Sequence, residues 1–262
     1  IEQFLDELHL SDLRNRMHPS IFDENDEYNM LIIRLPVIAQ KIGGQSFGFI
    51  FHGQNSFFYN KDEEKFEKLD DRFLGPYQII NAKTDALLKS FENYRSMIID
   101  MEERLYQNKN ADTFMIDWID LKRDMLLIER ILARTSEMLL IMMQHYEEAA
   151  DFPVNNYTDL HEHMERILHS ATHQLSKLDY LYNFYSARAN DKMNKMIYIL
   201  TIISAVFLPL NLLVGFFGMN TSSLPFTSSE TSGTLYVVFL MFSLSVITFT
   251  TALLWHKKTQ KQ

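Results

Sequence analysis

The chain has 262 residues, a formal net charge of -9 at pH 7 and no cysteine. The acidic balance argues against nucleic acid as a partner and is compatible with binding cations. Because cysteine is absent, disulfide bonds and thiolate metal sites are excluded, which suits a cytoplasmic domain. Nearly all of the long apolar stretches follow Met196, so we expect one water-soluble domain followed by a small membrane part.

The first 76 residues, in which glycine and proline are frequent, favour a small α/β unit. The stretches YNMLIIRLPVI (28–38) and SFGFIFHGQNSFFYN (46–60) are rich in β-branched and aromatic residues and are separated by two glycines, a pattern typical of strands. We expect these strands to form an abbreviated sheet. Together with the helices that follow, they predict a fold of the α+β class.

Long helices are predicted over the rest of the soluble part. Neither glycine nor proline occurs between Pro76 and Pro153, or between Pro153 and Pro209. Residues 84–107 and 115–146 repeat apolar side chains at helical spacing, which is most simply the core of a helical bundle. After a turn at Pro153, one helix of about 55 to 60 residues is expected to run into the first apolar stretch.

Within this long helix, Glu165, His169 and His173 recur at every fourth position and therefore share one face. Imidazole ligands suit Zn²⁺ better than Mg²⁺, so the three residues are a candidate zinc site. The alternative is that they belong to the polar surface of a helical bundle. Truncating His169 and His173 is expected to separate the two interpretations through its effect on zinc binding.

Two uncharged runs, residues 196–217 and 234–255, are each long enough to cross a bilayer as a helix. The alternative, a pair of buried core helices, is rare for two such runs in succession. Lysines lie just before the first run and just after the second, whereas residues 218–233 between them contain no Lys or Arg. The positive-inside rule therefore predicts a multi-pass protein of the cell (inner) membrane with both termini in the cytoplasm.

The first run carries polar groups among its apolar residues. On a helix, one face would hold Ile197, Leu200, Thr201, Ser204, Leu208, Asn211 and Gly215. An amide that faces lipid is unfavourable, so the Asn211 side chain is expected to face protein or water. A closed ring of identical chains with this face inward would meet that requirement. The alternative is that Asn211 only hydrogen-bonds a neighbouring helix.

The tripeptide GMN (218–220) ends the stretch IYILTIISAVFLPLNLLVGFFGMN, which is followed by the second run and a basic tail. Together these features resemble the CorA metal-ion transporter family, the two-span Gly-Met-Asn proteins. The resemblance implies a funnel-shaped homopentamer whose first span lines the pore, with Gly218, Met219 and Asn220 as the selectivity filter. A ring of neutral amides can accept hydrogen bonds from hydrated Mg²⁺ without stripping its water.

The same resemblance implies roles for other positions in the first span. Asn211 stands where the family commonly has Thr, Leu208 stands where Met is frequent, and Asn194 matches a polar ring at the cytoplasmic mouth. Ile197 and Leu200 match a hydrophobic constriction, and apolar rings of this kind can gate a pore by dewetting.

The resemblance also concerns two acids at the start of the long helix. Asp159 and Glu162 match acids that, in magnesium-gated relatives, lie at or beside a regulatory ion site between subunits. The alternative is that both are solvated acids that the helix dipole stabilises near the N-terminus.

The loop TSSLPFTSSETSG (221–233) departs from the acidic loop of many magnesium members and looks closer to the zinc-transporting ZntB branch. The expected function is divalent-cation transport, namely influx of Mg²⁺, Co²⁺ and Ni²⁺. The first alternative is Zn²⁺ transport of the ZntB type with proton coupling. The alternative from another class is a non-conducting membrane scaffold.

No phosphate loop, dinucleotide fingerprint or nucleophile elbow occurs, so we expect no enzymatic activity and no cofactor apart from transported and regulatory divalent cations. The expected partners are further copies of the chain, the lipid membrane and the cations themselves. The expected parts are a cytoplasmic α/β and helical domain (1–153), a stalk helix (154–195), the first membrane span (196–217), an external loop with the Gly-Met-Asn motif (218–233), the second span (234–255) and a basic cytoplasmic tail (256–262).

Overall fold

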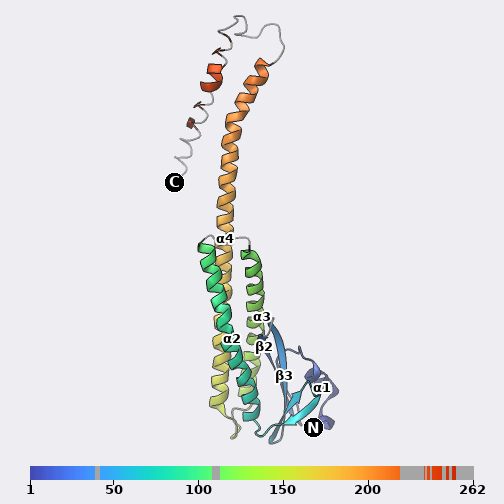
Figure 1. Cartoon of the computed structure of the whole chain (residues 1–262). Coiled ribbons are helices and arrows are strands. Elements are labelled where there is room, and N and C mark those ends of the chain that lie inside the picture. Colours follow the sequence, from blue (N-terminus) through green and yellow to red (C-terminus); the bar gives the residue numbers. More distant parts are fainter. Residues whose placement is uncertain are drawn as a thin grey trace. The chain divides into compact units, whose positions relative to one another are not determined.

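The structure, a computed structural model, describes residues 1–38, 42–107 and 113–218 and, in the C-terminal part, residues 233, 235–236, 238–243, 246–247 and 250–251. The chain divides into two compact units, Ile1–Asn183 and Phe184–Gln262. In chain order, the elements are η1 (Glu2–Phe4), α1 (Glu7–Arg14), β1 (Ile21–Glu24), β2 (Asn29–Ile38), β3 (Ile42–His52), β4 (Asn55–Asn60), β5 (Lys65–Lys68), α2 (Leu74–Tyr106), α3 (Phe114–His145) and α4 (Val154–Phe217) (Figure 1).

The five strands form one antiparallel sheet in the order β1-β2-β3-β4-β5. The strand expected at 28–38 is confirmed as β2, and the stretch 46–60 holds most of β3 and all of β4. These two strands are joined at Gly53, whose φ of 55° lies in the left-handed region that glycine adopts without strain. The short strands β1 and β5 and the helix α1 are additions to the elements expected from the sequence.

The sheet is covered on both faces, so both sets of alternating side chains in β2 are buried. Met30 and Ile32 pack with Leu13 of α1 in one apolar cluster. Leu31 and Ile33, which point to the opposite face, are fully buried as well and lie on the side of α2 and α3. Figure 1 shows α1 on one side of the sheet and α3 on the other. This two-sided burial explains why β2 reads as a nearly continuous apolar run.

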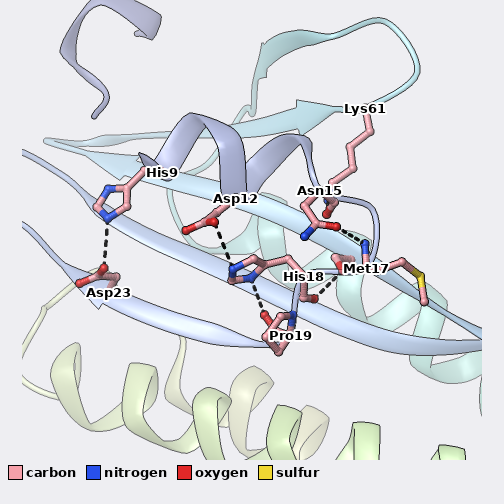
Figure 2. Close-up of polar contacts among 9 residues, drawn as sticks. His9, Asp12, Asn15, Met17, His18, Pro19, Asp23 and Lys61 are labelled. Atoms are coloured by element: carbon pink, nitrogen blue, oxygen red, sulfur yellow. Dashed lines mark hydrogen bonds and ion pairs between the residues drawn. The ribbon is translucent and has the colours of Figure 1, made fainter. Parts of the chain in front are cut away.

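Polar contacts hold α1 and its connection to the sheet in place, as Figure 2 shows. The Nε2 atom of His9 lies 3.1 Å from a carboxylate oxygen of Asp23 on β1. In the connection after α1, the Nε2 atom of His18 lies 3.3 Å from a carboxylate oxygen of Asp12. The two imidazoles are largely buried, so these pairs fix the position of α1 more strongly than exposed pairs would.

Lys61, which follows β4, reaches the end of α1. Its Nζ donates a hydrogen bond of 2.6 Å to the carbonyl oxygen of Asn15, the residue that ends α1. Burial, with a smaller contribution from the nearby charge of Arg16, lowers the pKa of Lys61 to about 8.

The helices confirm the long breaker-free segments. Helix α2 begins at Leu74, ten residues before the stretch singled out in the sequence, and includes Pro76. Proline is tolerated there because backbone N–H groups in the first turn have no partner within the helix. The Asp71 carboxylate accepts hydrogen bonds from the backbone N–H groups of Phe73 and Leu74, which caps this helix end.

Helix α4 is one continuous helix, as the pattern after Pro153 predicted. It has 64 residues and ends at Phe217, so it is somewhat longer than the helix expected from the sequence. Its buried residues recur three or four positions apart and face α2 and α3; they are Tyr157, Leu160, Met164, Ile167, Ala171, Gln174, Leu178 and Leu181. The hydroxyl of Tyr157, which is fully buried, donates a hydrogen bond of 2.9 Å to the carbonyl oxygen of Phe73 at the start of α2.

Replacing Tyr157 by Phe should lower the free energy of unfolding by about 1 kcal/mol, because a buried hydrogen bond between α4 and α2 is lost. The change is measured by thermal unfolding of the full-length protein in detergent micelles, followed by circular dichroism. Tyr77→Phe is the matched control, since Tyr77 packs on the Tyr157 ring and its hydroxyl makes no hydrogen bond to any described residue. Equal effects of both substitutions would contradict the assignment.

Candidate functional site: the apolar half of α4

The second half of α4 has a different surface from the first half. No residue of α4 after Leu181 is buried. Ile197, Leu200 and Leu208 are 54%, 64% and 74% exposed. Because exposure of so many large apolar side chains to water is unfavourable, another apolar environment or another chain must cover them.

Among the described residues, α4 is the only helix whose length and apolar composition would allow it to cross a membrane, and none of its most apolar 18 residues is buried. This exposure disfavours the alternative of a buried core helix. The second uncharged run (234–255) is described in part. Its described residues are helical, and Leu235, Phe239 and Phe242 are 72%, 71% and 69% exposed.

The continuous helix fixes which side chains of the first run share a face. At about 100° per residue, five of the expected pore residues fall within roughly 60° of one another. They are Ile197, Ser204, Leu208, Asn211 and Gly215, and together they are called the Asn211 face below. Leu200 and Thr201 flank this face by roughly 20° on either side, and Asn194 lies roughly 40° beyond its edge.

The polar groups on and beside this face differ in how they are satisfied. The hydroxyl of Thr201 donates a hydrogen bond of 2.9 Å to the carbonyl oxygen of Ile197, so its own helix satisfies it. Asn211 is exposed, and its amide has no partner among the described residues. In an apolar environment such an amide requires water, an ion or another chain as its partner.

The end of α4 lies next to the Gly-Met-Asn motif. Pro209 lies inside the helix, where it removes one backbone donor, yet the helix continues to Phe217. The backbone N–H of Gly218 donates a hydrogen bond of 2.8 Å to the carbonyl oxygen of Val214. A Cβ atom at Gly218 would lie 3.0 Å from the same oxygen, so the residue fits tightly. Met219 and Asn220 lie outside the described residues.

The acids and histidines that the sequence analysis singled out on the first half of α4 do not form one cluster in the structure. Glu165 and His169 lie together, with 3.5 Å between a carboxylate oxygen and Nε2, whereas His173 is exposed. Asp159 lies 3.6 Å from His163, and Glu162 is exposed. Across the described part of the chain, no three His, Asp or Glu side chains are arranged to hold a metal ion.

One polar cluster that the sequence analysis missed connects α3 to α4. The hydroxyl of Ser136 on α3 donates a hydrogen bond of 2.5 Å to Glu165 and lies 3.0 Å from Nε2 of His161. Ser136 is 3% exposed. Glu165 therefore has a partner within its own bundle. A signal for this contact was the serine that interrupts the apolar stripe of α3, but the sequence alone did not indicate which residue it meets.

A second cluster fixes α4 near the end of its buried stretch. The indole N–H of Trp118 on α3 donates a hydrogen bond of 2.8 Å to the carbonyl oxygen of Leu178, and its ring stacks on Tyr182. Lys122, one turn further along α3, lies 2.6 Å from Asp179 and above the Trp118 ring. These contacts set both the height and the rotation of this part of α4 relative to α3.

Comparison with known proteins decides the family. Residues 2–258 match the family described as CorA-like Mg²⁺ transporter protein, which is nearly the whole chain. The chain belongs to the CorA-like Mg²⁺ transporter family. The resemblance stated from the Gly-Met-Asn motif and its flanking residues is thereby confirmed, and the family is one of membrane transporters rather than of enzymes.

Individual relatives of this CorA-like chain are distant. The putative metal ion transporter YfjQ of Bacillus subtilis (strain 168) is 24% identical over 159 residues, which cover 58% of this chain and 49% of YfjQ. The matched segment thus spans about half the length of that relative. The complete structure of the CorA magnesium transporter from Methanocaldococcus jannaschii has a TM-score of 0.75 at 15% identity and covers 95% of this chain and 83% of that one.

The ZntB cytoplasmic domain from Vibrio parahaemolyticus RIMD 2210633 is also similar, with a TM-score of 0.60 at 12% identity over 72% of this chain and 81% of that one. At such low identities these likenesses establish the fold alone. They confirm a CorA-like fold with an N-terminal soluble α/β domain and a long helix.

Replacing Ser136 by Ala in this CorA-like chain should lower the free energy of unfolding by about 1–3 kcal/mol, because Glu165 and His161 both lose a partly buried partner. Chemical denaturation of the full-length protein in detergent measures the change. Ser176→Ala is the control, since this exposed hydroxyl bonds only the backbone of its own helix. A destabilisation no greater than that of the control would show that the cluster contributes nothing to the bundle.

Proposed function

We propose that the chain transports divalent metal cations across a membrane, with Mg²⁺, and Co²⁺ and Ni²⁺ beside it, as the transported ions. The observation that carries the proposal is the Asn211 face, which sets the polar side chains of Ser204 and Asn211 on an apolar, unburied helix that ends at Phe217, just before the Gly-Met-Asn motif, in a chain of a metal-transporter family. Hydrated cations need polar groups along their path, whereas lipid requires apolar groups on the outside.

The proposed assembly is a homopentamer in the cell (inner) membrane, in which residues 196–217 and 234–255 of each chain span the bilayer and both termini lie in the cytoplasm. One chain cannot enclose a pore with two helices. The support for a ring is that the side chains of Ile197, Leu200 and Leu208 are more than half exposed in the single chain, and that the Asn211 amide has no partner among the described residues. A cyclic arrangement covers both kinds of group at once.

In the proposed pore, Gly218, Met219 and Asn220 form the filter that first meets the ion. Amide oxygens of an Asn220 ring accept hydrogen bonds from the water shell, so Mg²⁺ enters without losing that shell. Asn211 forms a second amide ring deeper in the pore. Neutral amides hold the ion more weakly than carboxylates would, which favours its release.

Below the amide rings, the proposed pore narrows between apolar side chains. Leu208, Leu200 and Ile197 form apolar rings that empty of water in the closed state, and Asn194 lies at the cytoplasmic mouth. Thr201 and Ser204 lie between these rings, and Gly215 leaves space for the ion below the filter.

Asn220→Ala should reduce Mg²⁺ entry into liposomes at least tenfold while leaving the oligomer intact, because the amide ring that orients the hydrated ion is removed. The measurement is dye-detected Mg²⁺ influx into vesicles that contain the full-length protein, beside its oligomeric mass in detergent. Asn155→Ala, which removes an exposed amide from the start of α4, is the matched control and should transport normally.

Other outcomes of the same experiment select other functions. Zn²⁺ entry that requires a pH gradient, without Mg²⁺ entry, would replace the proposal by transport of the ZntB type. No entry of either ion from an intact wild-type oligomer would favour a non-conducting scaffold.

A zinc-related role for the first half of α4 is the second candidate, because the partly buried Glu165 and the exposed His169 lie 3.5 Å apart, with the exposed His173 one turn further. The single chain supplies one close carboxylate–imidazole pair, so zinc binding requires ligands from a second copy. Asp159 and Glu162, near the start of α4, are the corresponding candidates for a regulatory divalent ion shared between copies.

The double substitution His169→Ala and His173→Ala should abolish high-affinity Zn²⁺ binding by the full-length oligomer, as measured by calorimetric titration with zinc chloride. Thr172→Ala with Ser176→Ala changes two exposed residues of the same helix segment without removing a ligand, and should leave the titration unchanged. Unaltered zinc binding by the histidine variant would remove these residues from consideration as ligands.

A further inference from the structure

Helix α1 depends on contacts outside itself. It has eight residues, a length at which an isolated helix is not stable in water. Leu13 attaches it to the apolar cluster on the sheet, and two histidines with side chains that are 17% and 15% exposed add polar contacts. His9 belongs to α1, and His18 lies in the connection to β1. Both rings are therefore placed to affect how firmly α1 is held.

The contacts of His9 are complete when its ring is neutral. Its Nε2 lies 3.1 Å from a carboxylate oxygen of Asp23 and donates to it, because a carboxylate only accepts. Its Nδ1 lies 2.8 Å from the hydroxyl of Tyr28, which can donate its proton to that nitrogen. The same hydroxyl oxygen accepts a hydrogen bond of 3.0 Å from the backbone N–H of Asp6. A neutral His9 with its proton on Nε2 therefore matches every partner.

The contacts of His18 require a charged ring. Its Nδ1 lies 2.8 Å from the carbonyl oxygen of Pro19, and its Nε2 lies 3.3 Å from a carboxylate oxygen of Asp12, as Figure 2 shows. A carbonyl and an ionised carboxylate can only accept, so each ring nitrogen needs a proton for a favourable contact. A neutral imidazole carries one N–H and would turn a lone pair toward one of the two oxygens. The imidazolium is the form that satisfies both.

The backbone at His18 is attached to the sheet, whereas Asp12 belongs to α1. Ser46 of β3, which is 2% exposed, donates a hydrogen bond of 2.7 Å to the carbonyl oxygen of His18. Its backbone N–H donates to the carbonyl oxygen of Arg16 at 3.3 Å. The His18 ring therefore connects a fixed segment to the helix through the Asp12 carboxylate.

Among the described residues, Asp12 is the one ion-pair partner of His18. The charged and titratable side chains of the elements around α1 contact other groups: Arg14 lies beside Tyr59, Arg16 pairs with Asp62, Asp23 with His9, Glu24 with His145, Lys65 with Glu63 and Glu67 with Asn60, while Arg34 reaches the sulfur of Met17 and His52 stacks on Phe4. Lys61 donates to the carbonyl oxygen of Asn15, which an amine can do in either charge state. The charge of His18 is therefore coupled most directly to Asp12.

We propose that His18 is a pH-responsive anchor of α1. While the ring is charged, it holds the Asp12 carboxylate on α1 and the Pro19 carbonyl before β1 at the same time. When the pH rises and the ring loses a proton, the remaining proton stays on Nδ1, whose contact is the shorter one. The lone pair of Nε2 then faces Asp12, and α1 opens more often. The stabilisation is thus present at lower pH and lost as the pH rises.

Hydrogen–deuterium exchange of the full-length protein in detergent, read by mass spectrometry on peptides that cover α1, measures this opening. It is compared at about pH 5.5 and about pH 7.5, across the range in which imidazole side chains ordinarily change charge. After correction for intrinsic exchange rates, protection of α1 in the wild type should fall about threefold or more, as expected for loss of a partly buried ion pair. Lys61 stays mostly charged over this range, because its pKa is about 8.

His18→Gln and Asp12→Asn should each give low protection of α1 at both pH values, since the charged contact is absent throughout. His9→Gln is the matched control: it also removes contacts of α1 and lowers protection, yet the dependence on pH should persist. Asp26→Asn changes an exposed acid between β1 and β2 and should behave as the wild type. Equal protection of the wild type at both pH values would overturn the inference, as would a pH dependence that His9→Gln removes and His18→Gln keeps.

Solid-state NMR of the full-length protein labelled with ¹⁵N-histidine reads the ring directly. The His18 signals, assigned by their absence from His18→Gln, should show two protonated nitrogens at the lower pH and one unprotonated nitrogen at the higher pH. The same charge state at both pH values would contradict the anchor. If His18→Gln does not fold, Asp12→Asn replaces it in both experiments. The anchor lies within the unit Ile1–Asn183 and does not rest on transport, so cation flux into vesicles tests the proposed function separately.

Discussion

The structure depends on one constraint, namely that a single helix must serve two environments. The residues of α4 up to Leu181 present a stripe of buried side chains to α2 and α3, whereas none of the later residues of α4 is buried. No glycine or proline interrupts the helix before Pro209. Apart from the donor that Pro209 lacks, the backbone groups can therefore be satisfied within the helix in both parts, which is the condition for a chain segment to enter an apolar medium.

Within the unit Ile1–Asn183, polar contacts fix the rotation of α4 at the end of its buried stretch. Apolar side chains alone permit small rotations, because Leu and Met adapt to several packings. The indole hydrogen bond from Trp118 to the carbonyl oxygen of Leu178 is directional, so it restricts the rotation of α4 more than apolar packing does. An ion pair between Lys177 and Glu102 on α2, whose side chains are both about three-quarters buried, restricts the helix from the other side. Directional contacts thus complement the apolar stripe near Leu178, where the buried stretch of α4 ends.

The sequence allowed the large elements to be predicted because their patterns are long. The apolar stripes of α2, α3 and α4 extend over many turns, and β2 is a ten-residue apolar strand. The short elements were missed because β1 and β5 have four residues each and α1 has eight. Elements of this length hold few apolar residues among their charged ones, so no periodic pattern can be recognised. Their stability comes from tertiary contacts, such as those of Leu13 with the sheet, which a local pattern does not contain.

Within the candidate site, the positions that share a face on the apolar half of α4 followed from helical geometry, because one continuous helix leaves no freedom in their relative phase. The motif residues Met219 and Asn220 lie outside the described residues, so their role stays a prediction. The contacts of Glu165 were not predictable, since helical spacing identifies the residues on a face but does not say which partner covers it. Ser136 on α3 turned out to be that partner.

The arrangement of the acids and histidines has a consequence for any metal site on α4. Ser136 donates to one carboxylate oxygen of Glu165, and the other oxygen lies toward His169, so the second oxygen is the one placed to share a metal ion with this imidazole. The described part of one chain offers two neighbouring ligands at most, whereas zinc sites use four and Mg²⁺ requires an octahedral set of oxygens. The missing ligands must come from water or from another copy of the chain. Metal binding here would therefore depend on assembly, and a bound ion would stabilise one arrangement of the subunits over others by its own binding energy.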